Sequence, residues 1–262
     1  MYMAKRRLNL KYRRIINIIV LIIALICLTL VIYSIINIVN WKINVDDNKN
    51  IQNKINDNIT IVEPTEEKEA EYNIDFKALK EINEDTIAYL KVNGTNIDYV
   101  VVKGNDNSYY LKHNFEKNLN IAGWIFADYH NNFDELDKNI VIFGHNTKDG
   151  SMFGTLKNVL NKEWYENKDN YKIILVTEMT IYYYQVFSTY SIKAEDYYIN
   201  TEFVNNEEFK KFINKLKSRS IYNYEIEVSG NDKILTLSSC IGDGSKRVVL
   251  HAKLLTNEDY NL

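Results

Sequence analysis

The stretch ILTLSSCIGDGSKRVVLHAK, residues 234–253, predicts two β-strands joined by a short Gly-rich loop. Its apolar runs, 234–239 and 247–254, are rich in β-branched residues and are separated by Gly, Asp and Ser. If these strands pair as a hairpin, Cys240 and Arg247 lie near one edge of the sheet. A neighbouring cation favours the nucleophilic thiolate. The pair therefore indicates a reactive cysteine, although a buried structural cysteine and a surface arginine have the same pattern.

A long apolar run near the N-terminus, IINIIVLIIALICLTLVIYSIINIV at 15–39, contains no charged residue. At about 1.5 Å per residue it is long enough to cross a hydrocarbon core of about 30 Å. A cleaved signal peptide would have a shorter apolar region and a small-residue cleavage site, which is missing here. We therefore expect an uncleaved, single-pass signal anchor. Residues 1–14 form its basic cytoplasmic tail, and everything after the anchor is extracellular.

Charge and cysteine usage narrow the function of the exported part. The first 40 residues hold six of the 32 Lys and Arg residues and none of the 35 Asp and Glu residues, so the rest carries a net charge of −9. An acidic ectodomain argues against nucleic-acid binding. Cys27 lies within the anchor, which leaves Cys240 as the single exported cysteine. A lone cysteine in an oxidising compartment is either a reactive thiol or an accident.

The exported part divides into a linker and one folded domain. Residues 40–72 are polar and charged without a sustained period, which predicts a stalk or flexible linker that can include some helix. A globular pattern covers 73–262 and opens with helical spacing at Phe76, Leu79 and Ile82. Further helices are expected at 151–166 and at 205–219, the second with Asn205 and Glu208 in capping-box register.

Short apolar runs outnumber these helices. Eight candidate strands follow from them: 97–102, 121–126, 139–143, 171–177, 181–190, 224–228, 234–239 and 247–254. Many short strands with few helices favour a closed barrel or a sandwich over a doubly wound α/β sheet. The fold class is therefore mostly β with helices.

Four histidines are possible partners for the thiol. His145 follows the apolar strand NIVIF and a Gly, so it stands at a strand exit, where a scaffold can display a catalytic group. His113 and His130 lie in polar loop contexts. His251 is four residues beyond Arg247, about 13 Å along a strand, which makes it a poor direct partner for Cys240. No Cys or His pair has metal-ligand spacing, so neither a metal nor a cofactor is expected.

Three motifs together resemble the signature of class B sortases, which are membrane-anchored cysteine transpeptidases of Gram-positive bacteria. They are TLSSC at 236–240, Arg247 opening a V-V-x-H-A-K strand, and IFGHN at 142–146 with DGSMFG behind it. The resemblance covers about 73–262 and the layout of tail, anchor and stalk. It implies a closed eight-stranded β-barrel, with the helix at 205–219 in the loop between the sixth and seventh strands.

The resemblance also implies roles for individual positions. Cys240 matches the nucleophile, His145 the general acid that protonates the leaving amine, and Arg247 the cation that holds the substrate or its oxyanion. Five further positions match the groove that binds the sorting signal: Asn107, Leu111, Tyr198, Ile199 and Ser238.

The chain departs from the family pattern next to the cysteine. Ser239 stands where many members have Thr, and Ile241 stands where they have an acidic residue. A carboxylate role at 241 is thereby excluded, although its backbone N–H can still serve an oxyanion hole. The loop from Cys240 to Arg247 is also short for the class, which bears on the reach of Arg247.

The resemblance implies a transpeptidase that cleaves a C-terminal sorting motif after Thr through a thioacyl-enzyme. Its partners are secreted proteins with a sorting signal and an amine on a peptidoglycan precursor or a pilin. A pilin-polymerising sortase and a cysteine peptidase with water as acceptor remain open. The alternative outside enzymes is an inactive surface-binding barrel, which has no need for Cys240, His145 and Arg247 together.

Overall fold

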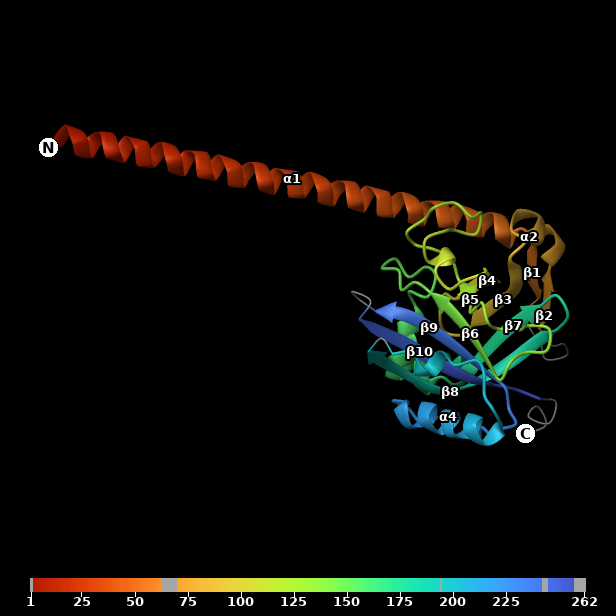
Figure 1. The fold of residues 1–262 in the computed structure, drawn as a ribbon. Helices are drawn as coiled ribbons and strands as arrows, with labels where there is room; N and C mark the ends of the chain where they lie inside the picture. Colours follow the sequence, from red (N-terminus) through yellow and green to blue (C-terminus); the bar gives the residue numbers. More distant parts are fainter. Residues whose placement is uncertain (1, 63–69, 194, 242–244, 257–262) are drawn as a thin grey trace. The chain divides into compact units, whose positions relative to one another are not determined.

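The computed structural model describes residues 2–62, 70–193, 195–241 and 245–256 (Figure 1). The chain forms two units, which divide between Asp46 and Asp47. The α-helices of the described part are α1 (Tyr2–Asn56), α2 (Phe76–Ile82), α3 (Lys162–Glu166) and α4 (Asn206–Arg219). Short 3₁₀ helices are η1 (Tyr109–Leu111), η2 (Leu156–Leu160), η3 (Lys168–Tyr171) and η4 (Tyr197–Ile199).

The first unit is the N-terminal part of α1. By length and composition, the helix between Tyr12 and Asn56 can cross a membrane. Its large apolar side chains between Ile15 and Val39 are exposed. A continuous apolar surface of this kind is typical of a lipid-facing helix rather than of a soluble domain. The helix is therefore a candidate membrane span, and it contains the expected segment 15–39.

Strand pairing in the second unit closes a barrel in the order β10-β8-β7-β3-β4-β5-β6-β9 (Figure 1). The pairs β4 with β5 and β6 with β9 are parallel, and the other neighbours are antiparallel. This confirms the predicted closed eight-stranded barrel. The strands are β3 (Thr86–Val92), β4 (Asp98–Val102), β5 (Phe126–Ala127), β6 (Asn139–Gly144), β7 (Lys172–Thr177), β8 (Ile181–Lys193), β9 (Ile234–Ile241) and β10 (Lys246–Leu254). A separate hairpin pairs β1 (Ile59–Val62) with β2 (Glu71–Ile74).

The period of two along each strand separates an inner face from an outer face. On β9, Leu235 and Leu237 are fully buried in the main core, whereas Ile234 belongs to a second cluster that includes α4. Thr236 and Ser238 therefore lie on the outer face with Ile234, because alternate residues point to opposite sides of a sheet. Thr236 and Ser238 give the outer face of β9 its polar side chains, while Ser239 has the parity of the inner face.

Helix α4 lies in the connection between β8 and β9 and confirms the helix predicted at 205–219. Its apolar side chains Phe209, Ile213 and Leu216 are buried in the second cluster. The Asn205 side chain accepts a hydrogen bond from the Glu208 amide at 2.9 Å, as the capping-box spacing predicts. Helix α4 thereby covers the outer face of the barrel beside β8 (Figure 1).

The strand membership differs from the prediction in three places. Residues 224–228 form no strand, because Glu225 has a positive φ of 53° and the Tyr224 ring packs edge-on against Tyr171 instead. Strand β3 was not predicted, since the helical spacing before it masks the point where α2 ends at Ile82. The run at 121–126 contributes only its last residue, Phe126, to β5.

Two segments outside the barrel also differ from expectation. Within 40–72, where a linker that can include some helix is expected, α1 continues to Asn56, and the hairpin β1–β2, which was not predicted, follows. The reason is tertiary, because Ile51 and Ile55 on one side of the helix are buried in the main core. At 151–166, one helix is replaced by η2 and α3, because Asn161 between them has extended backbone angles.

Candidate active site

Three neighbouring strands bring the predicted catalytic positions to one end of the barrel. Arg247 of β10 pairs directly with Cys240 of β9. Phe143 of β6 lies beside Ser238 in the parallel register, so His145 leaves β6 next to the end of β9. The backbone therefore places all three positions at adjacent strand ends. The structure describes the backbone of Cys240 but not its side chain.

The exit from β6 is fixed by a close contact between Gly144 and Phe153. A Cβ atom on Gly144 would lie 2.6 Å from the Phe153 ring, closer than real contacts allow. Phe153 is fully buried, and its amide donates to the His145 carbonyl at 2.9 Å. The motif IFGHN and the DGSMFG behind it are thus two sides of one packed turn. This turn fixes the direction in which His145 leaves β6.

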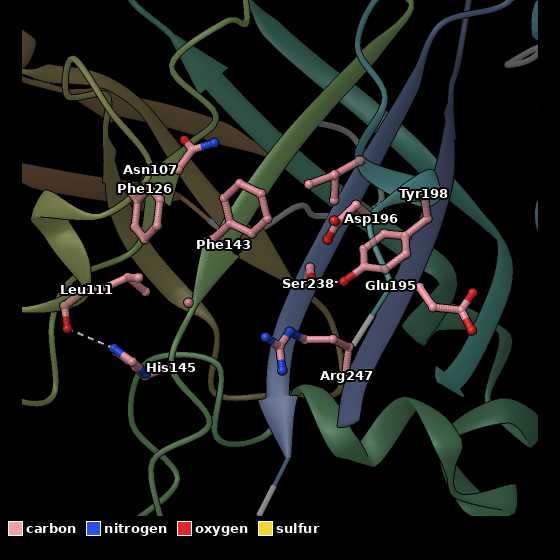
Figure 2. Close-up of a pocket in the computed structure, with 12 residues that line it drawn as sticks. Asn107, Leu111, Phe126, Phe143, His145, Glu195, Asp196, Tyr198, Ser238 and Arg247 are labelled. Carbon is pink, nitrogen blue, oxygen red and sulfur yellow. Dashed lines mark hydrogen bonds between the residues drawn. The ribbon is translucent and has the colours of Figure 1, made fainter. Parts of the chain in front are cut away.

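The imidazole of His145 is half-buried and is held by the backbone of η1. Its Nε2 lies 2.8 Å from the Leu111 carbonyl oxygen (Figure 2). Because a carbonyl only accepts, Nε2 carries the proton in this bond. Nδ1 is then the ring nitrogen that is left to exchange a proton with a reacting group.

The start of η1 is fixed by Asp106. Its carboxylate accepts hydrogen bonds from the Ser108 hydroxyl at 2.7 Å and from the Ser108 and Tyr109 amides at 2.6 and 2.8 Å. These bonds, with the Ser108 hydroxyl first, hold the pKa of Asp106 below its ordinary value. The ionised carboxylate therefore anchors the short helix that carries Leu111.

A cavity of about 240 Å³ opens beside these strand ends (Figure 2). All five predicted substrate-binding residues line it, together with His145 and Arg247. The further lining residues are Phe126, Phe143, Gly144, Glu195 and Asp196. The structure therefore brings together side chains from η1, β5, β6, β9, β10 and the segment before α4.

The wall opposite His145 is polar. The Tyr198 hydroxyl and Ser238 Oγ are 3.0 Å apart, which ties η4 to β9. Arg247 is half-buried, and its Nη1 donates to the Lys246 carbonyl at 3.1 Å. Figure 2 shows its guanidinium beside Ser238. A half-buried guanidinium with five fixed donors is suited to hold developing negative charge.

The other wall carries Asn107, whose amide is oriented by its neighbours. Its Nδ2 donates to Asp128 at 2.8 Å, and its Oδ1 accepts from the Tyr129 amide at 3.1 Å. The same Asp128 carboxylate lies 2.8 Å from Nδ1 of His130, which is not part of the cavity lining. Asn107 therefore enters the cavity as a positioned amide.

The remaining histidines are engaged elsewhere. His113 stacks on Tyr109, and its Nδ1 lies 2.8 Å from the Tyr109 carbonyl oxygen. His251 is fully buried between Thr236 and Tyr190. Among the described residues, no group of three or more His, Cys, Asp and Glu side chains is arranged to hold a metal ion.

Sequence reasoning missed two kinds of lining residue. Phe126 and Phe143 lie in short apolar strands, where a phenylalanine is ordinarily assigned to the core. The available signal for Phe143 was its parity, because it alternates with the buried Ile142 and therefore faces outward with the residue that follows Gly144. Glu195 and Asp196 carry no motif, and only their position three and two residues before the predicted Tyr198 pointed to them.

Comparison with known proteins identifies the family. The family model described as Sortase domain matches residues 90–255. Sortase B of Listeria monocytogenes is 35% identical over 239 residues, which are 87% of this chain and 96% of that protein. The chain belongs to the class B sortases.

Solved structures of the family agree with the barrel of this sortase. The crystal structure of sortase B from Bacillus anthracis matches with a TM-score of 0.70 at 31% identity, over 82% of this chain and 99% of that one. The Staphylococcus aureus sortase B–substrate complex matches with a TM-score of 0.65 at 33% identity, over 70% and 85% of the two chains. This sortase is therefore a cysteine transpeptidase built on the class B barrel.

Proposed function

We propose that this sortase cleaves a C-terminal sorting motif of secreted proteins after Thr, through a thioacyl-enzyme on Cys240, and transfers the protein to an amine of the cell wall precursor. The observation that carries the proposal is the pairing of Cys240 with Arg247 beside the cavity that His145 lines. The reacting carbonyl can then contact nucleophile, acid and cation from adjacent strand ends.

In the first half-reaction, the Cys240 thiolate attacks the Thr carbonyl and a carbon–sulfur bond forms. Arg247 and backbone N–H groups, including that of Ile241, stabilise the charge on the tetrahedral intermediate. The carbon–nitrogen bond then breaks, and the leaving amine takes a proton from His145. In the second half-reaction, the acceptor amine attacks the thioester, returns a proton to His145 and releases Cys240.

The hydrogen bond to Leu111 supports this role for His145. Because Nε2 is committed to the Leu111 carbonyl oxygen at 2.8 Å, the proton that moves in both half-reactions is the one on Nδ1. The imidazolium that forms donates from both nitrogens, so the same contact also stabilises the charged ring.

The lining of the cavity supports binding of an extended peptide. Asn107 supplies a fixed amide, Leu111 and Ile199 supply apolar surface, and Tyr198 and Ser238 supply hydroxyls. The S. aureus relative has been solved as a substrate complex. We assign the sorting motif of this sortase to the cavity lined by these residues, with its Thr carbonyl toward Cys240 and Arg247.

The apolar part of α1 supports a membrane location. We propose that residues 15–39 span the membrane once, with the basic residues 1–14 in the cytosol and the catalytic domain outside. The secreted substrate and the cell wall precursor would both meet the enzyme at the outer membrane surface.

The test uses the full-length chain in detergent micelles and a fluorogenic sorting-motif peptide. Cys240→Ala abolishes cleavage, whereas Cys27→Ala, the same substitution in the exposed helix outside the site, keeps it. An added amine yields a transpeptidation product, while its absence leaves only slow hydrolysis. Cleavage by Cys240→Ala at the wild-type rate would refute the proposal, and hydrolysis alone in the presence of amines would reassign the enzyme as a peptidase.

A further inference from the structure

A buried chain of hydrogen bonds on the outer face of the barrel is unused by the chemistry above. His251 on β10 lies directly across from Thr236 on β9, and its Nδ1 is 2.9 Å from the Thr236 hydroxyl. That hydroxyl is 2.6 Å from Oδ1 of Asn139 on β6. The other ring nitrogen of His251, Nε2, is 2.9 Å from the Tyr190 hydroxyl on β8. All four side chains are almost completely buried.

The donor and the acceptor of each hydrogen bond in this series can be assigned by starting from Asn139. Asn139 Nδ2 faces two carbonyl oxygens, which only accept, so its Oδ1 is the acceptor for the Thr236 hydroxyl. Thr236 has a single proton and has donated it, so its oxygen accepts from His251 Nδ1–H. The Nε2 atom of a neutral imidazole then accepts from Tyr190. With a neutral imidazole, each donor in this series of hydrogen bonds therefore has an acceptor, and none of the bonds places two protons or no proton between its two atoms.

The neutral state of the ring is maintained by its surroundings. Burial lowers the pKa of His251 to about 3. Burial likewise raises the pKa of Tyr190, whose hydroxyl therefore stays protonated and able to donate. The donor and acceptor roles in these hydrogen bonds are consequently the same throughout the physiological pH range.

Both ends of the chain reach the same short segment, η4. At one end, Asn139 Nδ2 donates to the Asn200 carbonyl at 2.9 Å and to the Tyr198 carbonyl at 3.4 Å. At the other end, the Tyr190 hydroxyl lies 3.4 Å from that of Tyr197. Helix η4 carries Tyr198 and Ile199, which line the cavity beside Arg247 (Figure 2).

We propose that Asn139, Thr236 and His251 are positioning residues that hold η4 in place and thereby set how tightly the cavity binds the peptide substrate. The substrate part of the proposal rests on the function proposed above. None of the three lines the cavity, so they act through the backbone of η4 and the placement of Tyr198 and Ile199. Their loss should weaken peptide binding and leave the chemical step at Cys240 largely unchanged.

The test substitutes Thr236 with Val, which keeps the shape and removes the hydroxyl. In the full-length chain, we expect Thr236→Val to raise KM for a sorting-motif peptide about three- to ten-fold, with kcat within about twofold of wild type. Thr236→Ser, which keeps the hydroxyl, restores KM. The matched control is Thr189→Val, because the buried Thr189 hydroxyl bonds to Tyr224 at 2.7 Å and has no bond to η4. This control should lower the melting temperature without changing KM.

Hydrogen exchange provides a readout that does not depend on turnover. Backbone amides of 195–201 should exchange faster in Thr236→Val than in wild type, and should be unchanged in Thr189→Val. If Thr236→Val is not recovered folded, Tyr190→Phe tests the chain from its Tyr197 end. Equal effects of Thr236→Val and Thr189→Val on KM and exchange would overturn the proposal. A wild-type chain that cleaves no sorting peptide would overturn the proposed function, while exchange at 195–201 still tests the positioning of η4.

Discussion

Replacing Gly144 with Ala tests whether the packed turn behind His145 sets the geometry of catalysis. The new Cβ would lie 2.6 Å from Cγ of Phe153 and 2.9 and 3.0 Å from its two Cδ atoms. Ordinary carbon–carbon contact is about 3.6 Å, so roughly 1 Å must open between the two residues. Gly144 does not have a positive φ, so the effect of the substitution is steric alone.

The strain falls on His145, because the ring of Phe153 cannot move away. Phe153 is fully buried, and its amide is bonded to the His145 carbonyl at 2.9 Å. A displacement of about 1 Å in a catalytic group lowers its rate on the order of 100-fold. We therefore expect Gly144→Ala to lower kcat by about that factor, with a loss of about 1–3 kcal/mol in the free energy of unfolding from overpacking.

The assay measures kcat and KM with a fluorogenic sorting-motif peptide, and unfolding by denaturant. Adding Phe153→Leu to Gly144→Ala makes room for the Cβ and should recover part of kcat. Gly104→Ala is the matched control, because its Cβ would meet its nearest neighbour, the Tyr110 ring, at an ordinary 3.4 Å. A folded Gly144→Ala enzyme with kcat within about twofold of wild type would show that the turn does not position His145.

Three further outcomes can be measured directly. Arg247→Lys keeps the charge but loses the planar donor fork, so kcat/KM should fall about 100-fold in the peptide assay, and a fall below about threefold would contradict the role of the guanidinium. Asn205→Ala removes the N-cap of α4 and should lower the free energy of unfolding by about 1 kcal/mol, seen as a drop of about 2–4 °C in Tm; an unchanged Tm would mean that the cap is not stabilising. The pKa of His251 is about 3 in the folded protein against 6.5 in the unfolded chain, so between these pH values only the unfolded state binds the proton. The contribution of His251 to the free energy of unfolding is therefore complete above pH 6.5 and is progressively lost below it. Between pH 7 and 5 the wild type should therefore lose about 2 kcal/mol more than His251→Gln in denaturant titrations, and parallel losses would refute the assignment.

The barrel was predictable because its strands are short, punctuated and rich in β-branched residues. The predicted number of eight barrel strands is right, but one of the predicted strands does not form and β3 takes its place. Residues 224–228 have the composition of a strand, but Tyr224 is used in packing against Tyr165 and Tyr171. Strand β3 was hidden by the helical spacing of Phe76, Leu79 and Ile82. Local patterns therefore gave a mostly β fold, the family resemblance gave the closed barrel, and contacts distant in sequence decided which runs enter the sheet.

The site was predictable to the extent that it lies in motifs. TLSSC and IFGHN end two neighbouring strands, and the parallel register that joins β6 to β9 cannot be read from either motif alone. Glu195 and Asp196 reach the cavity only because η4 is held against the barrel from distant strands. Ile51 and Ile55 gave no sign of burial, since the surface that covers them comes from the barrel.

The antiparallel ladder between β9 and β10 has a consequence for how the enzyme can be altered. Because Cys240 and Arg247 are partners in that ladder, the separation of their backbones is set by strand pairing. In this chain the backbone of Arg247 lies directly across from that of Cys240, although the loop between them is short for the class. Insertions in this loop that preserve the register, such as epitope tags or acceptor-binding segments, are expected to keep the spacing of the nucleophile and its cation.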